Sequence, residues 1–147
     1  MPVVGLNIRN INAKKTQEIT GPVKVNNTTN FVEIKEHNLE PLNKIALSVS
    51  FTFKAEYSAE NSKKSVAEIE INGDVLFLDA EHETILKGWK KDKKLPDDVN
   101  IQIINTILRK CITKALDLSE ELQLPPPVAL PFAQKKQQEE SGSRYIG

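Results

Sequence analysis

Few side chains in this sequence could carry out chemistry, and they lie far apart. The two histidines are His37 and His82, and the single cysteine is Cys111. Nucleophilic catalysis needs a nucleophile, a base and a group that orients the base, and no motif here joins these residues into such a set. Cys111 falls among the apolar positions of a predicted helix, where a cysteine is typically a small buried hydrophobe. We therefore predict no catalytic residues and no enzymatic activity.

The segment DAEHE, residues 79–83, is the one place where carboxylates and an imidazole are clustered. These groups are ligands that zinc accepts. Acidic residues are also typical of the first turn of a helix, where the helix dipole favours negative charge, and the sequence favours this interpretation. The glycines form neither a P-loop nor a dinucleotide-binding motif. We expect no metal site and no cofactor.

Lysines surround the only tryptophan, Trp89, in the segment LKGWKKDKK. Such a cluster could bind phosphates while the indole stacks on a base. The alternative is a solvated basic turn with a partly buried Trp89, and the sequence favours it because the chain carries 20 basic and 20 acidic residues and nothing extends the patch. A nucleic-acid partner is therefore not expected. The cluster consists of Lys87, Lys90, Lys91, Lys93 and Lys94.

The composition is that of one folded domain. The chain has 147 residues, of which 39% are hydrophobic, enough for a core without metals or disulfides. No apolar run approaches the roughly 18 to 20 residues that cross a bilayer, and residues 1–10 lack the apolar core of a signal peptide. We expect a cytoplasmic protein that does not insert into membranes.

Alternation of apolar and polar residues predicts four strands. Residues 44–57 alternate throughout, and residues 66–80 alternate around Gly73, which we expect to mark a bulge or a bend. Residues 3–13 change phase in the middle, as a bulge would require. Residues 21–36 form a weaker strand with a polar interruption. Four strands joined by short connections predict an antiparallel meander with one face to be covered.

A long helix is predicted from Asp97 or Asp98 to about Leu122, with acidic residues at its positive end. The predicted fold class is therefore α+β, a four-stranded antiparallel sheet packed by one long C-terminal helix. The apolar surface of this helix is wider than one sheet needs, which favours a dimer or tetramer in which a second subunit covers part of it. The alternative is coverage by the following segment and the N-terminal arm. The predicted oligomer interface consists of Ile101, Ile104, Leu108, Cys111 and Ala115.

The segment LQLPPPVALPF, residues 122–132, must end the helix because proline cannot continue it. Its apolar residues either line a groove for another chain or form a lid over the core, and the sequence leaves both open.

The segment ILRKCITKALDLSEELQLPPPVALPF, residues 107–132, resembles the SecB export chaperone family, in which an Arg-x-Cys-Ile stretch on the long helix precedes a proline-containing segment ending in Phe. The resemblance implies protein transport and binding of unfolded polypeptide clients without ATP. The alternative function is an oligomeric adaptor that binds a specific protein or nucleic acid through the Lys87 to Lys94 patch. By position in the family fold, the polypeptide-binding residues would be Phe51, Phe53, Phe77, Trp89, Leu124, Val128, Leu130 and Phe132.

The chain differs from the family after the proline-containing segment. Members of the family usually carry a second helix there, whereas this chain continues as AQKKQQEESGSRYIG. We expect one domain over residues 1–132 and a polar, disordered tail over residues 133–147.

Overall fold

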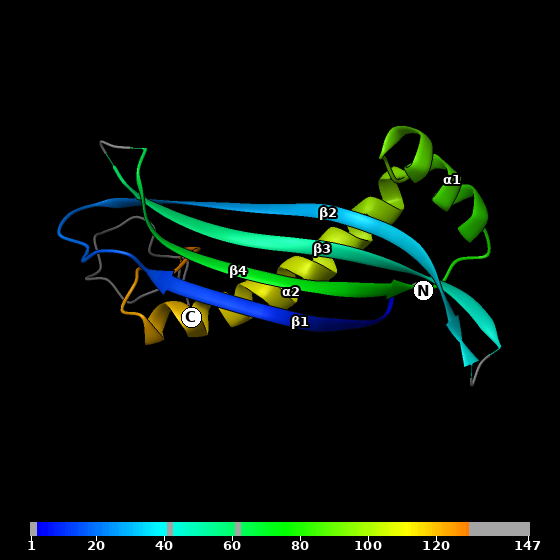
Figure 1. Cartoon of the computed structure of the whole chain (residues 1–147), viewed down its shortest axis with the longest axis horizontal. Coiled ribbons are helices and arrows are strands. Elements are labelled where there is room, and N and C mark those ends of the chain that lie inside the picture. The colour runs from blue at the N-terminus through cyan, green and yellow to red at the C-terminus, as the bar shows by residue number, and fades with distance from the viewer. Residues whose placement is uncertain (1–2, 41–42, 61–62, 130–147) are drawn as a thin grey trace, which may run out of the picture.

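The structure is a computed structural model that describes residues 3–40, 43–60 and 63–129. One antiparallel sheet has a long helix across one of its faces (Figure 1), which confirms the predicted α+β class. The end of the predicted domain, residues 130–132, and the predicted tail, residues 133–147, lie outside the described residues. The elements are β1 (Val3–Lys15), β2 (Val23–Leu39), β3 (Lys44–Ala59), β4 (Ser65–Phe77), α1 (His82–Asp92) and α2 (Asp97–Glu121).

The order of the strands across the sheet is β1-β4-β3-β2. Strands β2, β3 and β4 form the predicted meander, but β1 is not beside β2: it pairs with β4 at the opposite edge. Residues 16–22 connect β1 to β2 around the end of the sheet (Figure 1). The connection must span the three strand spacings between β1 and β2, about 14 Å. Because each extended residue covers about 3.3 Å, residues 16–22 are long enough to do so. The polar stretch that weakened the prediction of this strand does not interrupt it, since β2 runs through it as one strand.

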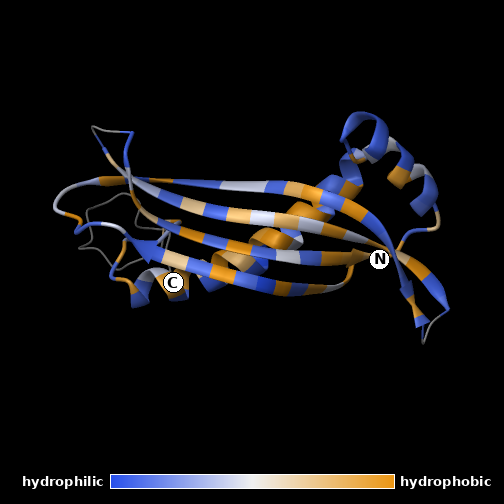
Figure 2. Ribbon diagram, viewed as in Figure 1, coloured by the Kyte–Doolittle hydropathy of each residue, from blue (hydrophilic) through white to orange (hydrophobic). Residues whose placement is uncertain are grey.

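Alternation along the central strands separates the two faces of the sheet, as the banding in Figure 2 shows. On β3, Phe51, Phe53 and Tyr57 are fully buried on the helix side. The alternate residues Thr52, Lys54 and Glu56 are half-buried on the other side, which we call the open face. On β4 the same division places Ile69, Ile71 and other apolar residues under the helix.

Helix α2 packs on the sheet through every fourth residue, a stripe inclined to the helix axis. The helix accordingly crosses the strands diagonally (Figure 1). Ile101, the first residue of the predicted oligomer interface, is not part of this stripe, since it is 57% exposed. The buried residues of α2 are Val99, Ile103, Ile107, Cys111, Ala115 and Ser119.

Both edge strands bulge at the same row of the sheet. The register shifts between Ile8 and Asn10 on β1, which confirms the predicted bulge, and between Phe31 and Glu33 on β2. Gly73 on β4 lies in this row, paired with Ile8 on one side and with Phe51 of β3 on the other. A Cβ at Gly73 would meet the carbonyl oxygen of Asn7 and lie 3.1 Å from both Ile8 Cα and Phe51 Cζ. Gly73 is therefore required by the close approach of β1.

The segment between β4 and α2 forms the short helix α1 rather than a loop. Its apolar face turns inward, with Ile85 and Trp89 buried. The helix ends at Lys93, whose φ of 57° is left-handed. Helix α1 thereby covers the end of the sheet next to β2 and β3.

The Gly73→Ala variant tests the row that contains both bulges. The added methyl group must displace the β1 backbone or Phe51, so we expect a loss of about 2 to 3 kcal/mol in the free energy of unfolding. Urea denaturation measures this loss. The matched control is Gly21→Ala, because nothing lies within 4 Å of a Cβ there, and its stability should be unchanged or slightly raised. Equal stabilities of the two variants would contradict the steric role of Gly73.

Candidate functional site

A groove of about 610 Å³ lies where β2, α1 and α2 meet. One wall is the stretch of β2 that contains the bulge, the second is the end of α1, and the third is the first part of α2. The lining residues are Thr29, Asn30, Phe31, Val32, Trp89, Lys93, Asn100 and Ile104.

An aromatic pair forms the base of this groove. The rings of Phe31 and Trp89 meet edge to face, with centroids 6.3 Å apart and planes at 64°. The ammonium of Lys93 lies 5.3 Å from the centre of the Trp89 ring, within the range of a cation–π contact. Because Trp89 is only 7% exposed, its ring is not free to stack on a nucleic-acid base.

The rest of the groove wall is apolar and accessible. Val32 follows Phe31 at the β2 bulge, where the register shift turns it outward, and it is 61% exposed. The buried stripe of α2 separates two flanks of the helix. One flank contains the residues that directly follow the buried positions in the sequence, and the other contains the residues that directly precede them. The first flank is apolar and half-buried (Ile104, Leu108, Ile112 and Leu116), whereas the second is mostly polar (Gln102, Thr106, Lys110 and Lys114).

The groove is bordered by the outer backbone of β2. Since β2 is at the edge of the sheet, no described strand pairs with its outer side. An unpaired edge of this kind can accept an extended peptide through main-chain hydrogen bonds.

The proline-rich segment after α2 lies against the same face of the sheet. Gln123 takes a left-handed φ of 58°, and the N–H of Leu124 donates to the carbonyl of Ser119, which turns the chain sharply away from the helix. The phenol of Tyr57 then donates to the Pro125 carbonyl at 2.6 Å, and the Asn27 amide donates to the Pro127 carbonyl at 3.0 Å.

Most residues predicted to bind polypeptides lie in the core. Phe51, Phe53 and Phe77 are at most 1% exposed, so a client cannot contact them in this structure. Trp89 and Leu124 are also buried, and Val128 is half-buried. Leu130 and Phe132 lie outside the described residues.

Sequence reasoning did not identify the part of the groove that β2 supplies. Phe31 and Val32 are adjacent apolar residues, and a strand that alternates cannot bury both on one face. This break in the alternation is the signal in the sequence that indicates the β2 bulge.

The residues of the predicted oligomer interface fall into two groups. Ile101 is exposed and Ile104 and Leu108 are half-buried, so all three have accessible surface that a partner subunit could contact. Cys111 and Ala115 are fully buried against the chain's own sheet, which leaves them no surface for a partner. Burial raises the pKa of the Cys111 thiol to about 11, with a smaller opposing effect of Lys110, so the thiol stays protonated at neutral pH.

The remaining candidates for chemistry do not gather into a site. His82 Nε2 lies 3.8 Å from Glu36 Oε2, and His37 lies on the open face. Within residues 3–40, 43–60 and 63–129, no three His, Cys, Asp or Glu side chains could hold a metal ion. Of the five clustered lysines, Lys93 contacts the Trp89 ring. The other four are exposed and make no cation–π contact within the described chain.

Comparisons with protein-family models and with curated proteins find no match for this chain. Among solved structures, the chain is similar to the Mycobacterium tuberculosis Rv1957 SecB-like chaperone in complex with a ChAD peptide from the Rv1956 HigA1 antitoxin. The sequences are 13% identical, and the match covers 92% of this chain and 91% of the other with a TM-score of 0.59. At this identity the likeness establishes the fold, which is SecB-like. In the described parts of the chain, no helix has the length and apolar character needed to cross a membrane.

The Tyr57 phenol allows a test of the contact with the proline-rich segment. Burial raises its pKa to about 12, and a side-chain hydrogen bond with Ser119 opposes this only in part. The ordinary pKa of an unfolded tyrosine is about 10. The folded state therefore holds the proton more tightly, and the stability that the neutral phenol provides is complete below pH of about 10 and is lost as the pH rises to about 12.

We expect wild type and Tyr57→Phe to differ in the pH dependence of unfolding. The stability of the wild type relative to the variant should be constant from pH 7 to about 9.5 and then fall. Urea denaturation at a series of pH values measures the difference. A difference that stays constant up to pH of about 12 would show that the phenol is not buried and hydrogen-bonded as described.

Proposed function

We propose that this protein is a chaperone-like binding protein that holds extended apolar segments of unfolded polypeptides without ATP. The observation that carries the proposal is the groove between β2, α1 and α2, where apolar side chains border an unpaired strand edge. Extended polypeptides present just these two features, a row of free backbone groups and apolar side chains on alternate residues.

The binding mode follows from the geometry of the groove. A client strand pairs with the outer backbone of β2, and every second client side chain enters the groove. There it contacts Val32, Ile104 and the edge of the Phe31 ring, all of which have surface available. No energy source is required, because burial of apolar area supplies the affinity.

The protein's own proline-rich segment supports this mode. Tyr57 and Asn27 bind the carbonyls of Pro125 and Pro127, backbone groups that any extended chain presents. The helix side of the sheet thus already holds one extended segment through side-chain donors. The antitoxin peptide bound to the similar M. tuberculosis chaperone is further support for a peptide as the ligand.

We also propose that the protein assembles into dimers or tetramers through the outer side of α2. Ile101 is 57% exposed on a helix surface where Leu108 is only half-covered. Exposed apolar area of this kind on a folded domain is typical of subunit interfaces.

The double variant Val32→Ser/Ile104→Ser tests the groove. Each truncation removes apolar surface worth roughly 1 kcal/mol when buried against a client, so we expect affinity for a reduced, permanently unfolded polypeptide to fall roughly tenfold or more. Fluorescence anisotropy of a labelled client measures affinity, and light scattering of an aggregating client measures protection. The melting temperature should fall only modestly, because Val32 is largely exposed and Ile104 is half-buried, and binding is compared at a temperature where both proteins are folded.

The matched control is Ile11→Ser, which removes an apolar residue that is 41% exposed on the opposite edge strand. It should bind clients as the wild type does. Equal affinities of the control and the double variant would exclude the groove. Binding of single-stranded nucleic acid that is lost in Lys90→Gln/Lys91→Gln, with no client binding, would favour the adaptor alternative instead.

The assembly is tested by Leu108→Glu. A charge in a buried subunit interface should dissociate the oligomer before it unfolds the subunit. Light scattering coupled to size exclusion measures the mass, and Gln102→Glu, which adds the same charge on the polar flank of α2, should keep the wild-type mass. A wild-type protein that is monomeric across micromolar concentrations would contradict the proposed assembly.

A further inference from the structure

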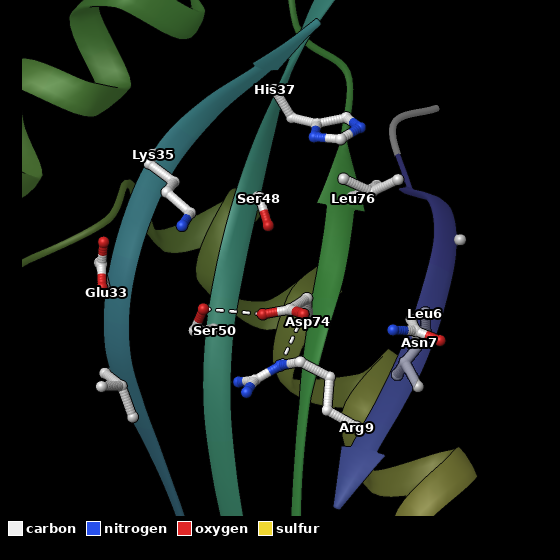
Figure 3. A pocket seen from close by; sticks show the side chains of 12 residues that line it. Leu6, Asn7, Arg9, Glu33, Lys35, His37, Ser48, Ser50, Asp74 and Leu76 are labelled. Carbon is white, nitrogen blue, oxygen red and sulfur yellow. Dashed lines mark hydrogen bonds and ion pairs between the residues drawn. The ribbon is translucent and has the colours of Figure 1, made fainter. Parts of the chain in front are cut away.

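The open face of the sheet, opposite α2, contains a hollow of about 810 Å³ to which all four strands contribute. The two bulges border it, and the residues at those bulges, Arg9 and Val32, both line it. A bulge bends its strand and strengthens the local twist, which explains why a sheet face is concave here. Figure 3 shows the hollow from the open side.

Arg9 is held in place by Asp74, whose two carboxylate oxygens each accept a hydrogen bond. Its Nε donates to Asp74 Oδ2 at 2.8 Å, and Asp74 Oδ1 accepts a hydrogen bond from Ser50 Oγ at 2.7 Å. The two terminal nitrogens of the guanidinium are left to point over β3 (Figure 3). A fixed guanidinium with free terminal N–H groups is a typical ligand of carboxylates and phosphates.

A second cation approaches from the other edge of the sheet. Lys35 extends from β2 toward β3, whereas Glu33 points to the outer side of β2 (Figure 3). Within the described residues, no carboxylate lies within ion-pair distance of Lys35. Asp74 is paired with Arg9, so the Lys35 ammonium is a cation without an ion pair on the β2 side of the hollow.

Directly across from Lys35, on β3, lies a buried hydroxyl that lacks a partner. Ser48 is 8% exposed, it lines the hollow, and its Oγ makes no hydrogen bond with any part of the chain that the structure describes. Burying a hydroxyl without a partner destabilises a protein. A ligand that bonds to Ser48 would account for this group.

From these observations we propose that the hollow binds a small organic anion, a carboxylate or phosphate monoester with an apolar body. Lys35 and Arg9 hold the anionic group, and Ser48 donates a hydrogen bond to it. The apolar body lies against Leu76 and Val32. The volume is in the range of pockets for small molecules, about 300 to 1,000 Å³. This site is on the face opposite the proline-rich segment, and Val32 is the one lining residue that it shares with the groove.

Titration of the ¹⁵N-labelled full chain with octanoate and with octyl phosphate tests the site. Both should shift the amide resonances of residues 5–9, 35–37, 48–50 and 74–76 in a saturable way, and the tighter of the two identifies the preferred head group. Octylammonium should not bind there, because the charge is wrong, and inorganic phosphate should bind more weakly because it lacks the apolar body. Shifts confined to Trp89 and Asn100 would mean that the alkyl chain enters the groove instead, and would overturn the proposal.

Variants distinguish a specific binding site for the anion from general electrostatic attraction to surface lysines. We expect Lys35→Gln to weaken binding about tenfold or more, and Ser48→Ala about fivefold, as losses of hydrogen bonds to a charged group. Because the Ser48 hydroxyl has no protein partner, Ser48→Ala should also keep or raise the melting temperature. The control is Lys24→Gln, on the same strand but outside the hollow, which should bind as the wild type does. Equal weakening by Lys24→Gln and Lys35→Gln, or wild-type affinity in Ser48→Ala together with a lower melting temperature, would overturn the proposal.

Discussion

The close approach of β1 to Gly73 is the contact on which both faces of the sheet depend. Only a residue without a side chain lets the Asn7 carbonyl and the Ile8 backbone pass at this distance. The same row places a bulge on each edge strand. One bulge turns Val32 into the groove beside α1, and both border the hollow on the open face. The row of Gly73 thus contains the bulges that border two surfaces, which share Val32 among their lining residues.

The helix side of the sheet is organised by the diagonal path of α2. Because the buried stripe advances by four residues, the two flanks of the helix meet different surroundings. The polar flank stays in solvent, whereas the apolar flank faces β2 and leaves room for an extended chain. On the same side of the sheet, Tyr57 and Asn27 hold the segment after the helix by its carbonyls. Proline suits this position, since its carbonyl accepts hydrogen bonds normally while its nitrogen cannot recruit another strand.

The SecB-like fold at 13% identity shows how little residue identity this architecture needs. Four alternating strands and one amphipathic helix reproduce the layers, because burial depends on the apolar pattern and not on particular side chains. Function depends on individual sites placed on those layers. In this chain the candidate sites are the Phe31–Trp89 pair with exposed Val32, and on the other face the Arg9–Asp74–Ser50 network with Ser48.

The sequence by itself determined the features that local periodicity encodes. Alternation predicted the strands, the change of phase in residues 3–13 predicted the β1 bulge, and the prolines fixed the end of α2. It also predicted that Cys111 is a buried hydrophobe, because an apolar helix position carries that information locally.

Only the tertiary structure decided which strands are neighbours and which apolar residues are core. Alternation separates two faces of a strand but does not say what covers each face, so Phe51, Phe53 and Phe77 could be assigned to a groove although they are buried under α2. The position of β1 beside β4 depends on long-range pairing, and the burial of Cys111 and Ala115 in place of Ile101 depends on the angle at which the helix crosses the sheet. The hollow could not be foreseen for the same reason, because its residues come from four strands that only the strand order brings together.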